Sequence, residues 1–352
     1  VGPMSVQKPL SERMDDIAHY YDDVLLSSKP IDDTAIEEVI DEFSRLRGLR
    51  LRSEKETVDL MKKSTNSGNP YFTKRRNVVL DTIPSELIHH PSGWADTKMF
   101  LPHWKGMTTA VLGWRGQEGG PTADDVKQRV VWMFPFAVNI AELRVYQPLI
   151  ESAQRFNLVP AWVSMDAVDR EITDLFDTKS PKDLIVCTDF SKFDQHFNRD
   201  LQNCTKSILG AILTPDKPSK MWLENIFPIK YTISLCIEAR DGAIHTLNGS
   251  HGMGSGSGGT NCDETLTHRA LQHEVALRNG KKLNPHSMCL GDDGILTYPG
   301  ITVDDVVKSY SSHGQECNPD KQYASTQDCV YLRRWHHDKY RVNGVCVGVY
   351  ST

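Results

Sequence analysis

Two adjacent carboxylates at a glycine-flanked chain reversal constrain this sequence more than any other feature. The segment Cys289-Leu290-Gly291-Asp292-Asp293-Gly294 lies between two short apolar runs, at 286–290 and 295–298. Apolar runs separated by such a turn signal predict a β-hairpin with Gly-Asp-Asp-Gly at its tip. Neighbouring carboxylates in one turn repel each other, and a divalent cation is the usual compensation. Asp-Gly is also common in ordinary hairpin turns, so a solvated loop is the alternative.

A second pair of carboxylates follows another apolar run. Residues 184–190 are dense in β-branched side chains and predict a buried strand that Asp189 closes, with Asp194 five residues later. A carboxylate at the end of a buried strand is costly unless it is paired or bound to metal. If Asp189 lies beside Asp292 on a neighbouring strand, three carboxylates converge and can bind two Mg²⁺ or Mn²⁺ ions. The alternative is that Asp189 caps a helix that begins there.

A stretch rich in glycine and serine, residues 249–259, predicts a loop. It runs directly into a predicted amphipathic helix from Thr260 to Asn279, which Gly280 ends. Glycines let the backbone approach a phosphate or a ribose closely, and hydroxyl groups at a helix start supply donors. The loop lacks the lysine of a P-loop and the strand–turn–helix context of a dinucleotide site. A flexible linker is the alternative.

The rest of the chain alternates predicted helices with short strands. Helical patterns cover 14–61, 138–152, 199–213 and 303–313, strand patterns surround 331–332 and 345–349, and 64–76 and 113–121 read as flexible loops. This order of elements predicts an α+β fold with antiparallel pairing.

The net charge of −6 excludes the overall basic character of proteins that coat nucleic acid. Local basic clusters at 74–76, at Lys127 with Arg129, and at Arg333 with Arg334 are nevertheless compatible with an enzyme that has a basic channel on an acidic body. No apolar run approaches the length of a membrane span, so no membrane association is expected.

Taken in order, these elements resemble the motifs of viral RNA-dependent RNA polymerases. Asp189-x4-Asp194 resembles the first palm motif of that family, Ser255-Gly256-x3-Thr260 the second, and Gly291-Asp292-Asp293 the third. The amino-acid sequences of the three segments are most similar to those of picobirnaviruses, with partitiviruses as the next nearest double-stranded RNA viruses. The resemblance covers roughly residues 64 to 335.

The resemblance implies a right-hand polymerase, an α+β fold with fingers and an RRM-like antiparallel palm sheet. It places an N-terminal helical region at 1–63, fingers at 64–180, and the palm at 181–335 with a fingers insertion at about 205–248. Residues 336–352 would begin a thumb. Because only residues 332–352 follow Tyr331, we expect the thumb to be largely absent from this chain.

The resemblance also implies the catalytic residues. Asp189 and Asp292 would hold two Mg²⁺ or Mn²⁺ ions, with Asp293 assisting, and Lys321 would act as a general acid toward pyrophosphate. Other roles fall on residues that would contact the nucleotide or the RNA. The nucleotide-binding residues are Lys127, Arg129, Asp194, Ser255, Thr260 and Asn261, and the RNA-binding residues are Ser67, Gly68, Pro70, Arg333 and Arg334.

One position departs from the family pattern. Many members carry asparagine four residues after the motif threonine, where it helps to recognise the ribose 2′-hydroxyl. Here that position is Glu264, with Asn261 and Asp263 nearby. Asp194 and Ser255 would sense the ribose, and the third partner stays open.

The function expected from the resemblance is an RNA-directed RNA polymerase, a nucleotidyltransferase that replicates and transcribes a viral double-stranded RNA genome. Its partners would be single-stranded RNA template, nascent RNA, ribonucleoside triphosphates and a viral capsid protein, and it would work in the virion interior and the host cytoplasm. One alternative is a reverse transcriptase or another palm-type polymerase. Reverse transcriptases usually carry an aromatic residue before x-Asp-Asp, where this chain has Leu290-Gly291. The other alternative is an inactive palm-fold RNA-binding protein.

Overall fold

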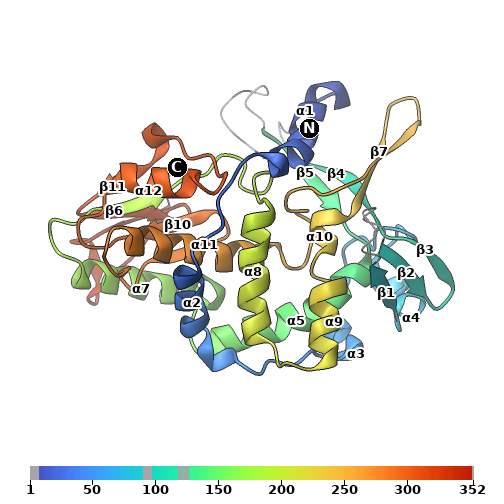
Figure 1. Ribbon diagram of the computed structural model, residues 1–352, viewed down its shortest axis with the longest axis horizontal. Helices are drawn as coiled ribbons and strands as arrows, with labels where there is room; N and C mark the ends of the chain where they lie inside the picture. The colour runs from blue at the N-terminus through green and yellow to red at the C-terminus, as the bar shows by residue number, and fades with distance from the viewer. Residues whose placement is uncertain (1–7, 90–96, 118–121, 123–126, 351–352) are drawn as a thin grey trace. The chain divides into compact units, whose positions relative to one another are not determined.

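The computed structural model describes residues 8–89, 97–117, 122 and 127–350 (Figure 1). The chain forms two compact units, each assembled from segments that are distant in sequence. The first unit takes Val1–Leu26, Leu51–Gln147 and Asp216–Thr260, and the second takes Ser27–Arg50, Pro148–Pro215 and Asn261–Thr352.

A four-stranded mixed sheet forms the centre of the first unit. Its strands are β4 (Thr109–Gln117), β5 (Lys127–Met133), β7 (Ser234–Glu238) and β8 (Ile244–Leu247), in the order β5-β4-β7-β8. β4 pairs antiparallel with β5 and parallel with β7. The fully buried Trp132 of β5 lies in an apolar core with Ile17 and Val138, which belong to α1 (Leu10–Asp22) and to the start of α5 (Phe136–Arg155).

The remaining elements of the first unit are short. They are α3 (Glu54–Leu60), η4 (Arg75–Asn77), α4 (Val79–Thr82), the three-stranded antiparallel sheet β1 (Glu86–His89), β2 (Thr97–Leu101) and β3 (Trp104–Met107), and the helices η2 (Asp23–Leu25), α9 (Lys217–Asn225) and α10 (Ile229–Thr232).

An antiparallel four-stranded sheet forms the centre of the second unit. Its strands are β6 (Ile185–Thr188), β9 (Met288–Leu290), β10 (Asp293–Leu296) and β11 (Tyr323–Ser325), in the order β11-β6-β10-β9. All four residues of β6 are buried, as expected for a short central strand rich in β-branched side chains. The predicted α+β class with antiparallel pairing is confirmed for this unit.

Helices cover both faces of this sheet. α7 (Met165–Thr178) packs its apolar residues, among them Ile172, against Cys187 of β6 and Ile295 of β10 (Figure 1). The opposite face carries Gly294, where an added Cβ would lie 2.6 Å from the ring of His268 in α11 (Thr260–Arg278). The sheet therefore lies between α7 and α11, and no side chain fits at Gly294.

α11 differs from its prediction in one respect. The sequence predicts an amphipathic helix, yet every residue from Cys262 to Ala276 is buried. Several polar residues of the helix have protein partners in place of water. Gln272, for example, donates to the backbone oxygens of Met288 and Ile295.

Other helices and a C-terminal group of strands complete the second unit. They are α2 (Asp33–Glu42), η3 (Ser44–Leu46), α6 (Pro160–Val163), α8 (Arg199–Ile212), α12 (Val303–Ser311), η6 (Pro319–Lys321), β12 (Asp328–Tyr331), β13 (Arg334–His337), β14 (Arg341–Val342), β15 (Val345–Cys346) and β16 (Val349–Tyr350). Cys346 is fully buried with Ile185 and Cys329, so the C-terminal strands share the core of the unit.

The segment 113–121 is not wholly a loop, because Gly113 to Gln117 pair with β5 within strand β4, and 118–121 lie outside the described residues. The domain limits expected from the sequence stay predictions, and the two compact units cut the chain at other positions. Within the part of the chain that the structure describes, no helix combines the length and apolarity that crossing a bilayer requires.

Candidate functional site

The Gly-Asp-Asp segment forms the predicted hairpin between β9 and β10, with a tighter tip than expected. Asp293 already belongs to β10 and pairs with Leu290, which leaves only Gly291 and Asp292 in the turn. Gly291 has φ +58°, the left-handed conformation that a two-residue hairpin turn requires at its first position. The turn therefore exposes Asp292 and holds Asp293 at the end of the ladder, where it is half-buried.

Two side chains of α11 form hydrogen bonds to the backbone of this turn. The hydroxyl of Thr265 accepts a hydrogen bond of 2.9 Å from the Gly291 N–H, and Nδ1 of His268 donates to the Gly291 carbonyl at 2.9 Å. Burial lowers the pKa of His268 to about 4, so the ring is neutral at pH 7. Sequence reasoning missed both residues, although two polar side chains three positions apart on a buried helix were a usable signal.

Asp189 follows β6 and is exposed. The side-chain amide of Gln322 brackets its backbone, accepting from the Asp189 N–H at 2.7 Å and donating to its carbonyl at 2.9 Å. The capping alternative is excluded, because the next helix, α8, begins at Arg199 and is capped by the side chain of Asn198. Asp189 therefore has a fixed backbone, and its carboxylate has no hydrogen bond or ion pair to a side chain of the described residues.

The strand register brings Asp189 and Asp293 together. Gly294 pairs with Thr188, so the next residues along the antiparallel strands, Asp293 and Asp189, come side by side. Burial, with added repulsion from Asp292 and Asp189, raises the pKa of Asp293 to about 6, although a hydrogen bond from the Leu332 N–H opposes the rise. A solvated turn would not produce this convergence.

Glu264 of α11 adds a buried carboxyl group to the cluster. Its side chain is hydrogen-bonded to Asp194, and it lies within electrostatic reach of Asp292. Burial first, and then Asp194, raise the pKa of Glu264 well above its usual range. Its Oε1 atom is buried and has no hydrogen-bond partner among the described residues. The departure from the family pattern therefore places a buried carboxyl group with a raised pKa where asparagine is usual.

These carboxyl groups fit divalent cations on their own chemistry. Asp189 and Asp292 are exposed, the pKa of Asp293 is raised in the absence of a cation, and Glu264 has an unpartnered oxygen. Hard divalent cations prefer carboxylate oxygens and would relieve this repulsion. Asp189 and Asp292, with Asp293 beside them, are the residues that could hold such ions.

Lys321 lies at the end of η6 and is exposed, next to the Gln322 that brackets Asp189. Its predicted role as a general acid stays a prediction. Arg333 is exposed in the turn between β12 and β13, and its predicted contact with RNA also stays a prediction.

The RNA-binding assignment of Arg334 is corrected. Its guanidinium forms an ion pair of 2.9 Å with Asp169 of α7, and both side chains are less than a tenth exposed. Asp169 also accepts from, or donates to, Nε2 of His336 at 2.7 Å, depending on the ring tautomer. Arg334 is therefore part of the buried interior of the second unit and is not available to a nucleic-acid strand.

The loop that carries the predicted RNA contacts Ser67, Gly68 and Pro70 lies in the first unit and is tightly packed. Ser67 is buried, and its backbone N–H and hydroxyl group both bond to Thr73. Gly68 has φ +62°, and an added Cβ would lie 2.7 Å from the carbonyl oxygen of Phe134. Ser67 and Gly68 therefore shape the loop instead of presenting side chains to RNA, which corrects the assignment of Ser67. Pro70 is half-buried and stays a candidate contact.

Lys127 and Arg129 lie on one face of β5, both exposed. The register places Arg115 of β4 directly opposite Arg129, so three cations share that face. Like charges directly opposite each other destabilise a ladder, which favours an anionic ligand as the reason for the arrangement. Arg115 was missed because its segment was interpreted as a loop.

The glycine- and serine-rich loop is packed, so it is not a flexible linker. An added Cβ at Gly256 would lie 1.6 Å from the carbonyl oxygen of Trp132, and one at Gly259 would lie 2.3 Å from the ring of Tyr146. The hydroxyl of Ser255 donates to the Val130 carbonyl at 3.3 Å and accepts from the Trp132 N–H at 3.4 Å. These two glycines are thus required by packing against β5 and α5.

The residues that begin α11 have protein partners. The hydroxyl of Thr260 is 3.3 Å from the carbonyl oxygens of both Gly254 and Ser257, so it closes the loop onto the helix. Asn261 is exposed, and its side-chain oxygen accepts a hydrogen bond of 2.8 Å from the indole of Trp162. Their predicted contacts with nucleotide stay predictions.

Comparison with known proteins places this geometry in a family. The sequence matches the family described as viral RNA-dependent RNA polymerase over residues 3–343. It is 59% identical over 352 residues to a protein of human picobirnavirus (strain Human/Thailand/Hy005102/-) that is described as a potential RNA-dependent RNA polymerase. That alignment covers 100% of this chain and 64% of the relative, so the chain spans slightly less than two thirds of the relative's length.

Two solved structures are similar over the whole chain. One is the crystal structure of the RNA-dependent RNA polymerase of a human picobirnavirus, with a TM-score of 0.94 and 59% identity, covering 100% of this chain and 66% of that one. The other is an insertion loop deletion mutant of such a polymerase, with the same TM-score and identity, covering 100% and 68%. The mixed helix-and-sheet fold is therefore that of a viral RNA-dependent RNA polymerase.

Proposed function

Because this chain belongs to the viral RNA-dependent RNA polymerase family, we propose that it catalyses RNA-directed synthesis of RNA from ribonucleoside triphosphates. The observation that carries the proposal is that the register sets Asp293 beside Asp189, next to the exposed Asp292, and that the negative charge of both neighbours adds to burial in raising the pKa of Asp293. Residues 181–335 would form the palm, with a fingers insertion at about 205–248, and residues 64–180 would form the fingers.

Asp189 and Asp292 would hold the divalent ions, and Asp293 would assist. Bound there, Mg²⁺ or Mn²⁺ would supply charge stabilisation to the attacking and leaving oxygens in phosphoryl transfer. The protein's own part is positional. Gln322 fixes the backbone of Asp189, while Thr265 and His268 fix the turn that presents Asp292. Neither carboxylate then has to be ordered during the reaction.

The basic face of β4 and β5 would neutralise the triphosphate. Lys127 and Arg129 are the residues expected from sequence, and Arg115 joins them through the register. Lys321 would donate a proton to the leaving pyrophosphate. Lys321 is exposed and lies next to Gln322, which holds the backbone of Asp189.

Asp194 would recognise the ribose 2′-hydroxyl, with Ser255 as the second expected contact. Glu264 is hydrogen-bonded to Asp194, so Glu264 would hold the carboxylate of Asp194 in position. A family asparagine would offer an amide at this position, whereas Glu264 offers a carboxyl group. Glu264 can therefore still form hydrogen bonds at this position, but through a carboxyl group in place of an amide.

The substrates of this activity would be a single-stranded RNA template, nascent RNA and ribonucleotides. A viral capsid protein as partner, a double-stranded RNA genome as product, and a location in the virion interior and host cytoplasm follow from the resemblance to picobirnaviruses. We keep them as parts of the proposal.

Incorporation of labelled ribonucleotides on single-stranded RNA tests the proposal. We expect incorporation that requires Mg²⁺ or Mn²⁺ and that falls by roughly 100-fold or more in Asp292→Asn. Asp59→Asn is the control, since Asp59 is exposed in α3. Equal activity in Asp292→Asn would refute the metal assignment.

The same assay separates the two alternatives. Preference for deoxyribonucleotides would support a reverse transcriptase. RNA binding without incorporation, in wild type and Asp292→Asn alike, would support an inactive RNA-binding protein.

A further inference from the structure

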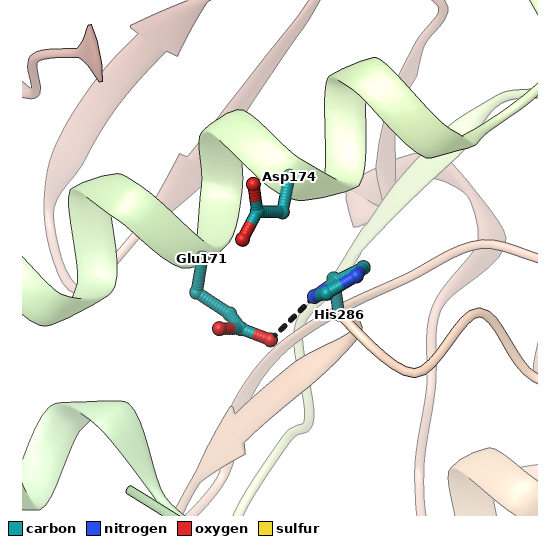
Figure 2. A group of neighbouring side chains, drawn as sticks. All are labelled: Glu171, Asp174 and His286. Atoms are coloured by element: carbon teal, nitrogen blue, oxygen red, sulfur yellow. Dashed lines mark hydrogen bonds and ion pairs between the residues drawn. The ribbon is translucent and has the colours of Figure 1, made fainter.

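Three side chains that are able to bind metal converge in the second unit, outside the carboxylate cluster described above. Glu171 and Asp174 lie one helical turn apart on α7, and His286 lies just before β9 (Figure 2). One ligand atom from each lies within 4.8 Å of the other two. Nδ1 of His286 is 2.8 Å from Oε1 of Glu171, a hydrogen-bond distance.

The sequence spacing explains the arrangement on the helix. Residues three apart on an α-helix lie on the same face, so Glu171 and Asp174 point the same way. The helix itself is held by Ile172, Leu175 and other apolar residues in the core of the unit. The two carboxylates therefore project from a rigid element.

The segment that carries His286 is held from two sides. Asn284 accepts from the His286 N–H at 3.0 Å and donates to the hydroxyl of Thr178, at the end of α7, at 3.0 Å. On the other side, Arg269 of α11 donates to the carbonyl oxygens of Pro285 and Ser287. The imidazole is thus positioned before any ligand arrives, as the ligands of metal sites usually are by their hydrogen-bonded surroundings.

The charge at this cluster is only partly compensated. No ion pair of Asp174 is found among the described residues, and His286 carries a charge only when it is protonated. Arg269 acts on Glu171 through space, yet its guanidinium is already bonded to Glu42 at 2.9 Å. Two carboxylates and one imidazole therefore lie together, and the ion pairs of the described residues compensate their charge only in part.

The simplest alternative is a plain ion pair of Glu171 with a protonated His286. That pair uses two of the three residues and gives no partner to the carboxylate of Asp174, which has no ion pair among the described residues. Asp174 is exposed, so the cluster is open to solvent and a small ion can reach it.

We propose that Glu171, Asp174 and His286 form a binding site for a divalent transition-metal ion, with Zn²⁺ as the best match. One imidazole nitrogen and two carboxylate oxygens suit Zn²⁺, and water would complete the shell. Mg²⁺ prefers oxygen ligands alone and is the poorer match. The site is separate from the proposed catalytic ions and does not depend on the polymerase assignment.

The site lies next to the strand that leads into the Gly-Asp-Asp hairpin. His286 lies two residues before β9, and β9 leads directly into the turn that presents Asp292. An ion held by His286 and by α7 would join that helix to the base of the hairpin. Bound Zn²⁺ would therefore stabilise the second unit against unfolding.

Calorimetric titration with Zn²⁺ tests the proposal. The starting protein carries Asp189→Asn and Asp292→Asn, so that the carboxylate cluster does not contribute binding. We expect one Zn²⁺ per chain that excess Mg²⁺ does not displace. Adding His286→Ala or Asp174→Asn should weaken binding by roughly tenfold or more. Asp174 is exposed and outside the core, so its variant keeps the fold.

His103→Ala is the matched control, because His103 is exposed in the first unit and should leave the titration unchanged. Anomalous diffraction at the zinc edge of crystals of the same chain then locates the ion. We expect a peak about 2.0–2.2 Å from a nitrogen of His286 and a carboxylate oxygen of Glu171. Absence of Zn²⁺ binding, equal binding in His286→Ala and Asp174→Asn, or a peak only elsewhere would each overturn the proposal.

Discussion

The carboxylate of Asp293 accepts a hydrogen bond of 2.8 Å from the backbone N–H of Leu332. This bond joins the hairpin of the Gly-Asp-Asp segment to the turn between β12 and β13, and it uses one oxygen of Asp293. Asp292, one residue earlier, is exposed at the tip. The two adjacent carboxylates thus have different environments, which supports Asp292 as the metal ligand and Asp293 as its helper.

Asp293→Asn should alter the pH dependence of stability in chelator-treated protein. The folded pKa of about 6 lies above the usual value of 3.8, so the folded state binds the proton more tightly and wild-type stability falls as the pH rises through about 6. The asparagine variant has no proton to lose at this position, so its stability does not fall in this way. Its free energy of unfolding relative to wild type should increase by roughly 1–2 kcal/mol between pH 5 and pH 8.

Urea denaturation at the two pH values measures this difference. Asp59→Asn, a substitution of an exposed aspartate, should show no such change. A constant difference between Asp293→Asn and wild type across the range would contradict the assigned environment of Asp293.

Glu264→Gln should stabilise the metal-free chain at alkaline pH. Burial and the neighbouring Asp194 raise the pKa of Glu264, so ionising it costs folding free energy that grows as the pH rises above its usual value. Glutamine keeps the shape and the hydrogen bonding without that cost. We expect the melting temperature of the variant to exceed that of wild type by more at pH 8 than at pH 5.

The control for Glu264 is Glu224→Gln, an exposed position in α9. If thermal unfolding showed the same melting-temperature difference at both pH values for Glu264→Gln, a burial cost at this carboxyl group would be excluded.

Gly256→Ala should destabilise the first unit, because the added methyl group would meet the Trp132 carbonyl at 1.6 Å. Backbone must shift to admit it, and we expect a loss of about 3 kcal/mol in the free energy of unfolding. Gly113→Ala is the matched control, since its nearest neighbour would lie at 3.5 Å, an ordinary contact. Denaturant unfolding of the two variants should therefore differ, and equal stability would show that the loop is not packed as described.

Arg333→Ala and Arg334→Ala should have separate effects. Removing Arg334 leaves Asp169 buried with fewer partners and should cost about 3–5 kcal/mol of stability. Removing the exposed Arg333 should change stability by less than about 0.5 kcal/mol. If Arg333 contacts RNA, its loss should weaken RNA binding and reduce the salt dependence of that binding. Filter binding at several salt concentrations, beside urea denaturation, would reject the assignment if Arg333→Ala bound RNA as wild type does.

Local patterns in the sequence were enough to predict the secondary-structure elements that carry the carboxylates. The strand ending at Asp189, the helix beginning at Thr260 and the hairpin around Asp292 were each predicted, because a short β-branched run, a glycine-ended helix and a turn signal are properties of neighbouring residues. The convergence of Asp189 with Asp292 was one of two possibilities and stays a prediction, whereas the register that sets Asp293 beside Asp189 depends on strand pairing between distant segments.

The errors share one physical cause, which is that burial depends on tertiary packing. Arg334 and Ser67 are of residue types that are usually exposed, yet both are buried here. Arg334 forms an ion pair with Asp169, and Ser67 is hydrogen-bonded to Thr73. Glycines assigned to ligand approach, such as Gly256, are required by the backbone of a neighbouring strand. Glu264 was noted only as a departure from the family pattern, and its contact with Asp194 became visible in the folded chain.

The most direct test of the central claim is anomalous diffraction from crystals of this chain soaked in Mn²⁺ with a ribonucleoside triphosphate. We predict Mn²⁺ peaks within about 2.0–2.5 Å of carboxylate oxygens of both Asp189 and Asp292. These peaks should be lost in crystals of Asp292→Asn. Mn²⁺ density that contacts neither carboxylate, or peaks at the cluster that persist unchanged in Asp292→Asn, would contradict the account.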